Sequence, residues 1–162
     1  MKTKILTFLF LLPVLMYFAT SCKQKNIKNL DHFYTDKGDW DAGRIPFIKP
    51  YEAINATKKF GWSINLKGED FDTGFPNIKR ANVIDSMILI YSTNTILHGI
   101  DVKQSWHIII PKQSIEKGFA SHQEYLHYLD SIGTRDEPQL HDIDSIADYF
   151  ETHDTIDWKA IN

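Results

Sequence analysis

The sequence predicts an α+β domain, in which an antiparallel β-sheet is followed by two C-terminal α-helices packed on one face of the sheet. Between residues 44 and 110, apolar residues alternate with polar ones or form short runs, which is the pattern of β-strands. From residue 121 onward, apolar residues recur every three or four positions, as in amphipathic helices. No helical pattern separates the strands, so an alternating parallel sheet is disfavoured.

The first two predicted strands differ in character. Residues 44–50 contain two prolines, which confine this segment to a sheet edge or to irregular extended chain, because proline cannot donate a ladder hydrogen bond. Residues 60–67 show the clearest alternation in the chain and predict a half-buried strand. Its apolar side is formed by Phe60, Trp62, Ile64 and Leu66.

The middle of the chain predicts further strands separated by polar segments. Residues 68–79 are typical of a polar loop, since they include two glycines and a proline. Residues 83–91 are nearly continuous in apolar residues, which favours one central strand covered on both faces, although Asp85 and Ser86 weaken its start. We also expect a turn at 92–95, a short return strand at 96–100 and a strand at 105–110 that ends at Pro111.

The first helix has clear signals at both ends. Ser121 and Glu124 fit a capping box, in which the serine accepts from the third helical amide and the glutamate reaches back. Gly133 stands where a left-handed residue commonly ends a helix. The apolar stripe of this helix is Tyr125, Leu126, Leu129 and Ile132. We expect this stripe and the apolar side of the Trp62 strand to share one core.

The second helix is predicted from about residue 142 to residue 152. Its stripe has the spacing of one helix face and consists of Ile143, Ile146, Ala147 and Phe150. Asp142 and Asp144 stand near the positive end of the helix dipole, which favours a helix start there.

Composition limits the classes of protein that this chain can be. The 162 residues have room for one domain. Residues 1–22 contain no acid and two of the 18 basic residues, so the remainder carries 16 basic and 21 acidic residues, a net charge near −5. This acidity disfavours a nucleic-acid binder. A single Cys excludes a disulfide framework, and no second apolar run is long enough to span a membrane.

The N-terminus is typical of a secretory signal peptide. Lys2 and Lys4 precede an apolar run at 5–18, which is short for a transmembrane helix. The next four residues, Ala19, Thr20, Ser21 and Cys22, resemble the lipobox of bacterial lipoproteins. They depart from its commonest form, which has Leu where Ala19 stands and Gly or Ala where Ser21 stands. The alternative is an ordinary signal peptide with a nearby Cys, but a secreted protein usually avoids a lone free thiol.

The resemblance to lipoproteins covers residues 1–22 and implies the fate of the N-terminus. Cys22 would receive the lipid and become the first mature residue, with acyl chains such as palmitate anchoring the protein in the membrane of the cell envelope. Lys23 follows in place of the Asp that, in the enteric sorting rule, retains lipoproteins in the inner membrane, so the outer membrane is expected. The expected organisation is a signal peptide at 1–21, the lipidated Cys and tether at 22–30, and one globular α+β domain at 31–162.

Several histidines and aspartates are candidate metal ligands. His122 and His127 are five apart, about 140° around a helix, so they do not share a face and should be solvent-facing. His98 and His107 lie on possible neighbouring strands and could be close, although packed, hydrogen-bonded side chains are the commoner role. The loop with Asp70 and Asp72 lacks the EF-hand pattern, and calcium binding there stays open. We expect no required metal or cofactor.

The sequence contains no nucleophile-elbow motif and no glycine-rich phosphate loop. We therefore expect a non-enzymatic binding module with an unknown protein partner and no nucleic acid. The segment from Trp106 to Leu129 resembles parts of small bacterial lipoproteins and of some toxin-immunity proteins, so an immunity-type inhibitor is one version. The alternative is a small envelope hydrolase with an unrecognised carboxylate or His site, which a concave pocket gathering His98, His107, Asp70 or Asp72 would favour.

Overall fold

The structure is a computed structural model and describes residues 30–39, 41–56, 61–66 and 74–161. The chain divides into two compact units, Met1–Leu30 and Asp31–Asn162, and the second is described here. The predicted signal peptide and lipobox, the predicted tether at 22–30 except for Leu30, and the loop with Asp70 and Asp72 lie outside the described residues. Within the part described, no helix is long and apolar enough to cross a membrane.

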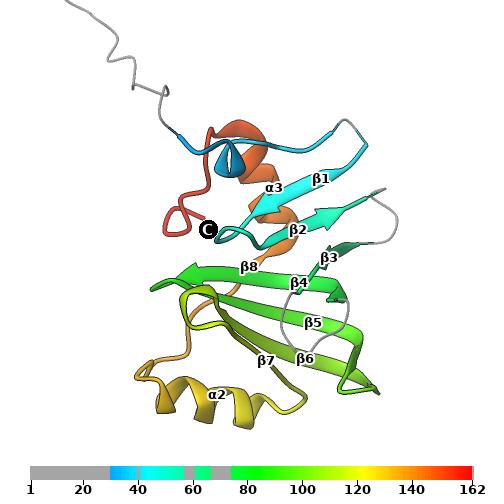
Figure 1. The fold of residues 1–162 in the computed structure, drawn as a ribbon, viewed down its shortest axis with the longest axis vertical. Helices are drawn as coiled ribbons and strands as arrows, with labels where there is room; N and C mark the ends of the chain where they lie inside the picture. Colours follow the sequence, from blue (N-terminus) through cyan, green and yellow to red (C-terminus); the bar gives the residue numbers. More distant parts are fainter. Residues whose placement is uncertain (1–29, 40, 57–60, 67–73, 162) are drawn as a thin grey trace, which may run out of the picture. The chain divides into compact units, whose positions relative to one another are not determined.

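The second unit contains an antiparallel sheet followed by two helices, which confirms the predicted α+β class (Figure 1). Strands β1 to β7 pair in the order of the chain, and the short strand β8 pairs with β4. Two 3-10 turns, η2 (His32–Tyr34) and η3 (Pro111–Gln113), flank the sheet segments. The strands are β1 (Gly43–Pro46), β2 (Glu52–Asn55), β3 (Trp62–Ile64), β4 (Phe75–Ile84), β5 (Met87–Leu97), β6 (Ile100–Ile110), β7 (Ile115–Phe119) and β8 (His141–Asp142).

Strand β4 has two different neighbours along one edge. Its first half pairs with β3 through Phe75 and Ile78. Its second half pairs with β8 through Arg80 and Ala81, while β5 occupies the other edge. The chain that follows the first helix is therefore brought back to the middle of the sheet.

The segment predicted as one central strand is instead a hairpin. Residues Asp85 and Ser86 have φ of 48° and 68° and form the turn between β4 and β5. Turns with two positive φ values match the twist of antiparallel strands. The prediction of one strand at 83–91 is wrong because apolar residues on both sides of a two-residue turn look continuous in sequence.

The turn predicted at 92–95 is also wrong, because β5 runs through these residues to Leu97. Ser92 and Thr95 are both buried within β5. The Ser92 hydroxyl donates to the Pro76 carbonyl, whereas the Thr95 hydroxyl has no hydrogen-bond partner among the described residues. The actual turn is at His98 and Gly99, with φ of 50° and 77°. The predicted return strand at 96–100 accordingly divides between the end of β5 and the start of β6, and residues 75–79 of the predicted polar loop belong to β4.

Both helices begin where their caps predict. Helix α2 (His122–Ser131) is capped by Ser121, whose hydroxyl accepts from the Glu124 amide. It ends before Gly133, which has φ of 91°, and the Gly133 and Thr134 amides donate to carbonyls of the last turn. Helix α3 (Ile143–Thr152) is capped by Asp142, whose carboxylate accepts hydrogen bonds from the backbone amides of Asp144 and Ser145.

The two helices pack on different faces of the sheet, which corrects the expectation that they share one face. Leu89 and Ile108 pack with Tyr125 and Leu129 of α2. Ile88, Ile90 and Ile109, their neighbours in the same strands, belong to the cluster that holds Ile143 and Ile146 of α3. Successive strand residues point to opposite faces. Figure 1 accordingly shows α2 beside β6 and β7, and α3 beside β1 and β4.

The Trp62 strand therefore packs with α3 and not with α2. Trp62, Ile64 and Leu66 are buried as the alternation predicts, while Phe60 lies outside the described residues. The Trp62 indole donates to the Asp144 carboxylate at 2.8 Å. The expectation of one core shared with the Leu126 helix is wrong, and Leu126 is only partly buried against the second cluster.

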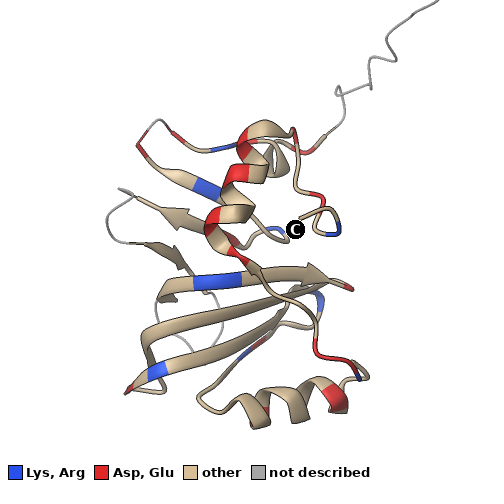
Figure 2. Cartoon of the chain, turned by 180° about the vertical axis from the view of Figure 1, so that it is seen from behind, with Lys and Arg blue, Asp and Glu red and all other residues tan. Residues whose placement is uncertain are grey.

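Helix α3 is amphipathic, as its sequence stripe predicts. Ile143, Ile146 and Phe150 are buried. Its exposed side is acidic, and Figure 2 shows Asp and Glu recurring along the helix. The exposed acids are Asp144, Asp148 and Glu151.

A buried side-chain contact connects the two ends of the sheet order. Tyr51, which directly precedes β2, donates its hydroxyl to the Glu116 carboxylate of β7. Burial, and then this hydrogen bond, raise the pKa of Tyr51 to about 12. Four strands separate β2 from β7 in the order of the sheet. Since the Tyr51–Glu116 contact nevertheless joins the two regions, the sheet curls so that its ends approach each other.

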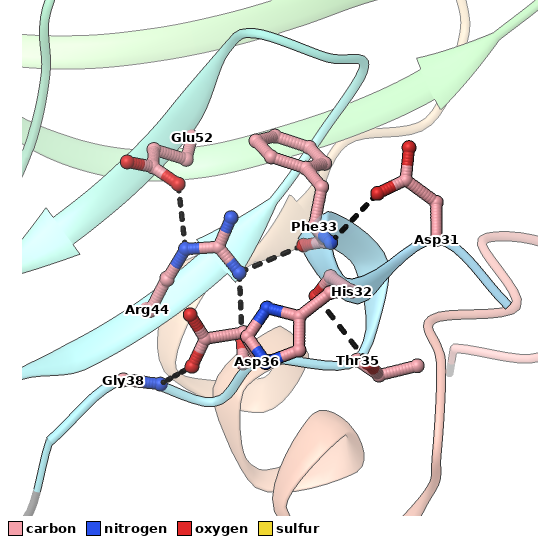
Figure 3. Close-up of polar contacts among 8 residues, drawn as sticks. All are labelled: Asp31, His32, Phe33, Thr35, Asp36, Gly38, Arg44 and Glu52. Atoms are coloured by element: carbon pink, nitrogen blue, oxygen red, sulfur yellow. Dashed lines mark hydrogen bonds and ion pairs between the residues drawn. The ribbon is translucent and has the colours of Figure 1, made fainter.

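Arg44 binds residues 33–36, near the start of this unit (Figure 3). Its Nη1 donates to the carbonyls of Phe33, at 2.8 Å, and Asp36, at 2.6 Å. Its Nε donates to the Glu52 carboxylate, and the guanidinium lies over the Phe33 ring, 4.6 Å from the centroid. One largely buried cation thus holds residues 33–36 against the first hairpin.

Candidate functional site

An open pocket lies where α2 stops covering the face of the sheet. Its volume is about 520 Å³, and we call it the Trp106 pocket. Strands β4, β5 and β6 each contribute a side chain, α2 contributes its first residue, and the connection from α2 to β8 forms a wall. The lining residues are Arg80, Tyr91, Trp106, His122, Glu137, Pro138, Gln139 and Leu140.

Three of these side chains form a row across neighbouring strands. Arg80 pairs with Tyr91 in the sheet register, and Tyr91 pairs with Trp106, so all three stand side by side on one face. The Arg80 guanidinium is 5.4 Å from the Tyr91 ring centroid, and the Tyr91 and Trp106 centroids are 5.3 Å apart. The adjacent residues Ala81, Ile90 and His107 are buried on the other face.

The row continues from the sheet to α2. The His122 ring lies 4.9 Å from that of Trp106, centroid to centroid. His122 occupies the first helical position because Ser121 caps α2. A guanidinium and three rings therefore follow one another along the pocket, and none of the four side chains is buried.

Glu137 ends the row with a carboxylate. Its Oε1 lies 2.8 Å from Nε2 of His122, and the two side chains are about half exposed. An exposed pair of this kind contributes less than about 1 kcal/mol, so the contact orients the two groups more than it stabilises the fold. The nearby Tyr125 hydroxyl is buried and finds no hydrogen-bond partner in the described part of the chain. Burial, and then the Glu137 charge, raise the pKa of Tyr125.

The wall of the pocket is held by backbone contacts. The Asn82 side-chain amide donates to the Gln139 carbonyl at 2.7 Å. Two residues later, His141 pairs with Ala81 in the β4–β8 ladder. Residues 137–140 are therefore fixed beside β4 at one end and beside α2 at the other, which gives the pocket a formed shape.

The charges of the pocket are only partly paired. Among the described residues, no carboxylate lies within 4.0 Å of the Arg80 guanidinium. Glu137 faces His122, which carries a charge only when protonated. The site thus offers aromatic rings, one available cation, and a carboxylate at the other end of the row.

The sequence interpretation of the helix histidines was half right. His127 is exposed on α2 as expected, and it lines a second hollow beside Leu126 and Arg135. His122 is not simply solvent-facing, because it lies between Trp106 and Glu137. In the described ranges, no three His, Cys, Asp or Glu side chains are grouped to hold a metal ion. The absence of a required metal or cofactor stays a prediction.

His98 and His107 do not line the pocket. His98 is exposed in the turn between β5 and β6. His107 is buried and stacks on Phe75 with ring centroids 3.7 Å apart, and its Nε2 lies 2.9 Å from the Ser105 hydroxyl. Burial, and then the charge of His98, lower the pKa of His107 to about 3. Its role in the fold is the packed and hydrogen-bonded one.

Sequence reasoning missed Arg80, Tyr91, Trp106 and Glu137 as site residues. Their signal is the cross-strand register, and that register depends on the turn at Asp85 and Ser86. Had the turn been placed there, Arg80 and Tyr91 would have been expected as a pair. The contribution of Glu137 carries no sequence signal, because it depends on where the connection after α2 runs.

The chain matches no protein-family model, no curated protein and no solved structure. Its function is therefore inferred from its own residues.

Proposed function

We propose that this chain is a lipid-anchored protein of the bacterial cell envelope that binds a small ligand in the Trp106 pocket without transforming it. The observation that carries the proposal is the row of Arg80, Tyr91, Trp106 and His122 along a formed pocket. Partly exposed aromatic side chains in a concave site, with a few convergent polar groups, are typical of ligand binding.

The size of the pocket supports a small ligand. About 520 Å³ falls within the range of roughly 300–1,000 Å³ that is usual for small-molecule sites. A toxin partner of an immunity protein would bury about 800 Å² on each side, over 20 to 30 residues. An immunity role would thus need a surface beyond these eight lining residues.

The anchor is proposed from the resemblance at Cys22. If Cys22 carries the lipid, replacing it by Ser should release the protein from the membrane fraction of cells, because one protein domain without acyl chains has no comparable membrane affinity. Sucrose-gradient separation of inner and outer membranes would also test the outer-membrane expectation. Retention of the Cys22→Ser variant in the membrane fraction would contradict the anchor.

Hydrolysis at the same pocket is a second candidate, favoured by the contact between His122 and Glu137. A carboxylate beside an imidazole can orient it as a general base. The described lining residues contain no Ser, Thr or Cys, so His122 would have to activate water directly. Binding is the better-supported function, because the aromatic row can hold a ligand without a nucleophile or an activated water.

The binding proposal is tested with the full-length chain in detergent. The binding of a panel of small molecules of the cell envelope, comprising sugars, muropeptides, amino acids and nucleotides, is measured by ligand-observed NMR. We expect at least one compound to bind, to be recovered unchanged, and to bind at least tenfold more weakly to Trp106→Ala. Lys103→Met, an exposed change on β6 outside the pocket, is the matched control.

Two results would contradict this function. One is that no compound binds, or that every compound that binds does so equally well to Trp106→Ala. The other is conversion of a bound compound to products by the wild type and not by His122→Gln, which would establish the hydrolase instead.

A further inference from the structure

We infer that the ligand of the Trp106 pocket is a saccharide bearing a carboxylate, with its sugar ring against Trp106 and its carboxylate at Arg80. The inference rests on the proposed function and names the class of ligand. Three features of the pocket carry it: the rings of the row, the available cation at one end, and the balance of charge.

The rings suit a pyranose. One side of a pyranose ring presents C–H groups, which pack on an aromatic surface, while its hydroxyls point outward and need donors and acceptors. Tyr91 and Trp106 supply the aromatic surface, and aromatic side chains contribute large apolar area together with a polar edge. The exposed Glu137 and Gln139 side chains stand around them as hydrogen-bonding groups.

Arg80 supplies the site for a carboxylate. Its guanidinium is exposed, lies against Tyr91, and has no carboxylate within 4.0 Å among the described residues. A guanidinium binds a carboxylate through two parallel hydrogen bonds. Because Arg80 directly follows Tyr91 and Trp106 in the row, a carboxylate attached to a stacked sugar ring would reach it.

Charge balance favours a carboxylate over a phosphate. Arg80 contributes one positive charge to the pocket and Glu137 one negative charge, so the lining is near neutral when His122 is uncharged. A phosphate monoester brings a charge of about −1.5 to −2 at neutral pH, which Glu137 would repel. A single carboxylate adds only one negative charge. When it binds Arg80, that charge lies at the end of the row farthest from Glu137.

The test uses two sugars that differ only at C6. The full-length chain in detergent is titrated with methyl α-D-glucuronide and with methyl α-D-glucoside, and both dissociation constants are measured by ligand-observed NMR. We expect the glucuronide to bind about two- to fivefold more tightly, which is the effect of one partly exposed ion pair. Arg80→Met should remove this preference, so that the two sugars bind that variant with equal affinity, and Trp106→Ala should weaken the binding of both sugars at least tenfold.

Controls separate the inference from the proposed function. Lys103→Met should retain the preference, and the thermal midpoint of each variant reports its folding. If Trp106→Ala does not fold, Tyr91→Ala and Arg80→Met carry the test. The carboxylate part of the inference would be overturned if the two sugars bound with equal affinity and Trp106→Ala weakened both. It would also be overturned if glucose 6-phosphate bound more tightly than the glucuronide. Binding of neither sugar would overturn the saccharide, while a Trp106-dependent amino acid or nucleotide would keep the proposed function.

Discussion

Removing the Arg44 side chain should detach residues 33–36 from the hairpin of β1 and β2. Arg44→Met deletes both hydrogen bonds to the Phe33 and Asp36 carbonyls and the ion pair with Glu52. The Arg44 side chain is only 9% exposed, against 36% for Glu52. The carboxylate can therefore regain water, whereas the two carbonyls regain it only if the segment lifts away.

The size of the loss follows from these bonds. A hydrogen bond from a charged donor contributes about 1.5–3 kcal/mol, so two such bonds to carbonyls set an upper range of roughly 3–6 kcal/mol. Detachment of the segment limits the loss, because its other contacts are exposed, such as the ion pair between Lys49 and Asp31. We expect a loss of about 2–4 kcal/mol in the free energy that holds the segment in place.

Limited proteolysis measures this local free energy. Lys37 directly follows residues 33–36, and its ammonium donates to the Glu151 carbonyl. Because Arg44→Met frees these residues, trypsin should cut after Lys37 at least tenfold faster in that variant. Lys49→Met is the matched control, since it removes an exposed ion pair expected to contribute less than about 1 kcal/mol. Equal cleavage at Lys37 in wild type, Arg44→Met and Lys49→Met would refute the reasoning.

Three further predictions concern the core. Tyr51→Phe should lower the free energy of unfolding by about 1.5–3 kcal/mol, because a buried carboxylate loses a donor; Tyr125→Phe, which removes a hydroxyl with no partner among the described residues, should leave it unchanged or raise it, and urea denaturation of both variants compares them. The pKa of His107 is about 3 in the folded state against 6.5 when unfolded, so the unfolded state takes up a proton first and stability should fall as pH drops from 6.5 toward 3; a His107→Asn variant with the same pH dependence would contradict this. Leu129→Ala should cost about 2–5 kcal/mol and Leu126→Ala less, because only Leu129 is fully buried, and equal thermal midpoints for the two would contradict the assignment of the buried face.

The helices could be predicted because their signals are local. Ser121, Asp142 and Gly133 act within one turn of the positions they mark, and each does in the structure what its residue type favours. The alternation at the Trp62 strand is equally local, and its described part is buried as expected.

The turns and the faces were harder because they depend on distant residues. Asp85 with Ser86 and His98 with Gly99 adopt positive φ, yet neither pair is the Asn-Gly or Asp-Gly sequence that most clearly predicts such turns. The choice of face for each helix depends on which apolar side chains of distant strands it packs against. No period within the helix itself carries that information.

The candidate site depends on the same non-local register. Arg80, Tyr91 and Trp106 are separated by about a dozen residues each in the sequence, and only the two hairpins bring them into one row. His122 could be placed at a helix start from its cap, but its neighbours could not. The binding role is a prediction from the sequence, and the site proposed for it depends on the register of the sheet.

The most direct test of the account is where a ligand touches the protein. The chain has four tryptophans, each with an indole N–H that gives one NMR signal, and Trp106→Phe assigns the signal of Trp106. Titration of the full-length chain with methyl α-D-glucuronide should shift the Trp106 indole in a saturable way and leave the buried Trp62 indole in place. A saturable shift at another tryptophan without a shift at Trp106 would contradict the Trp106 pocket as the binding site, and no shift at any tryptophan would contradict the saccharide as its ligand.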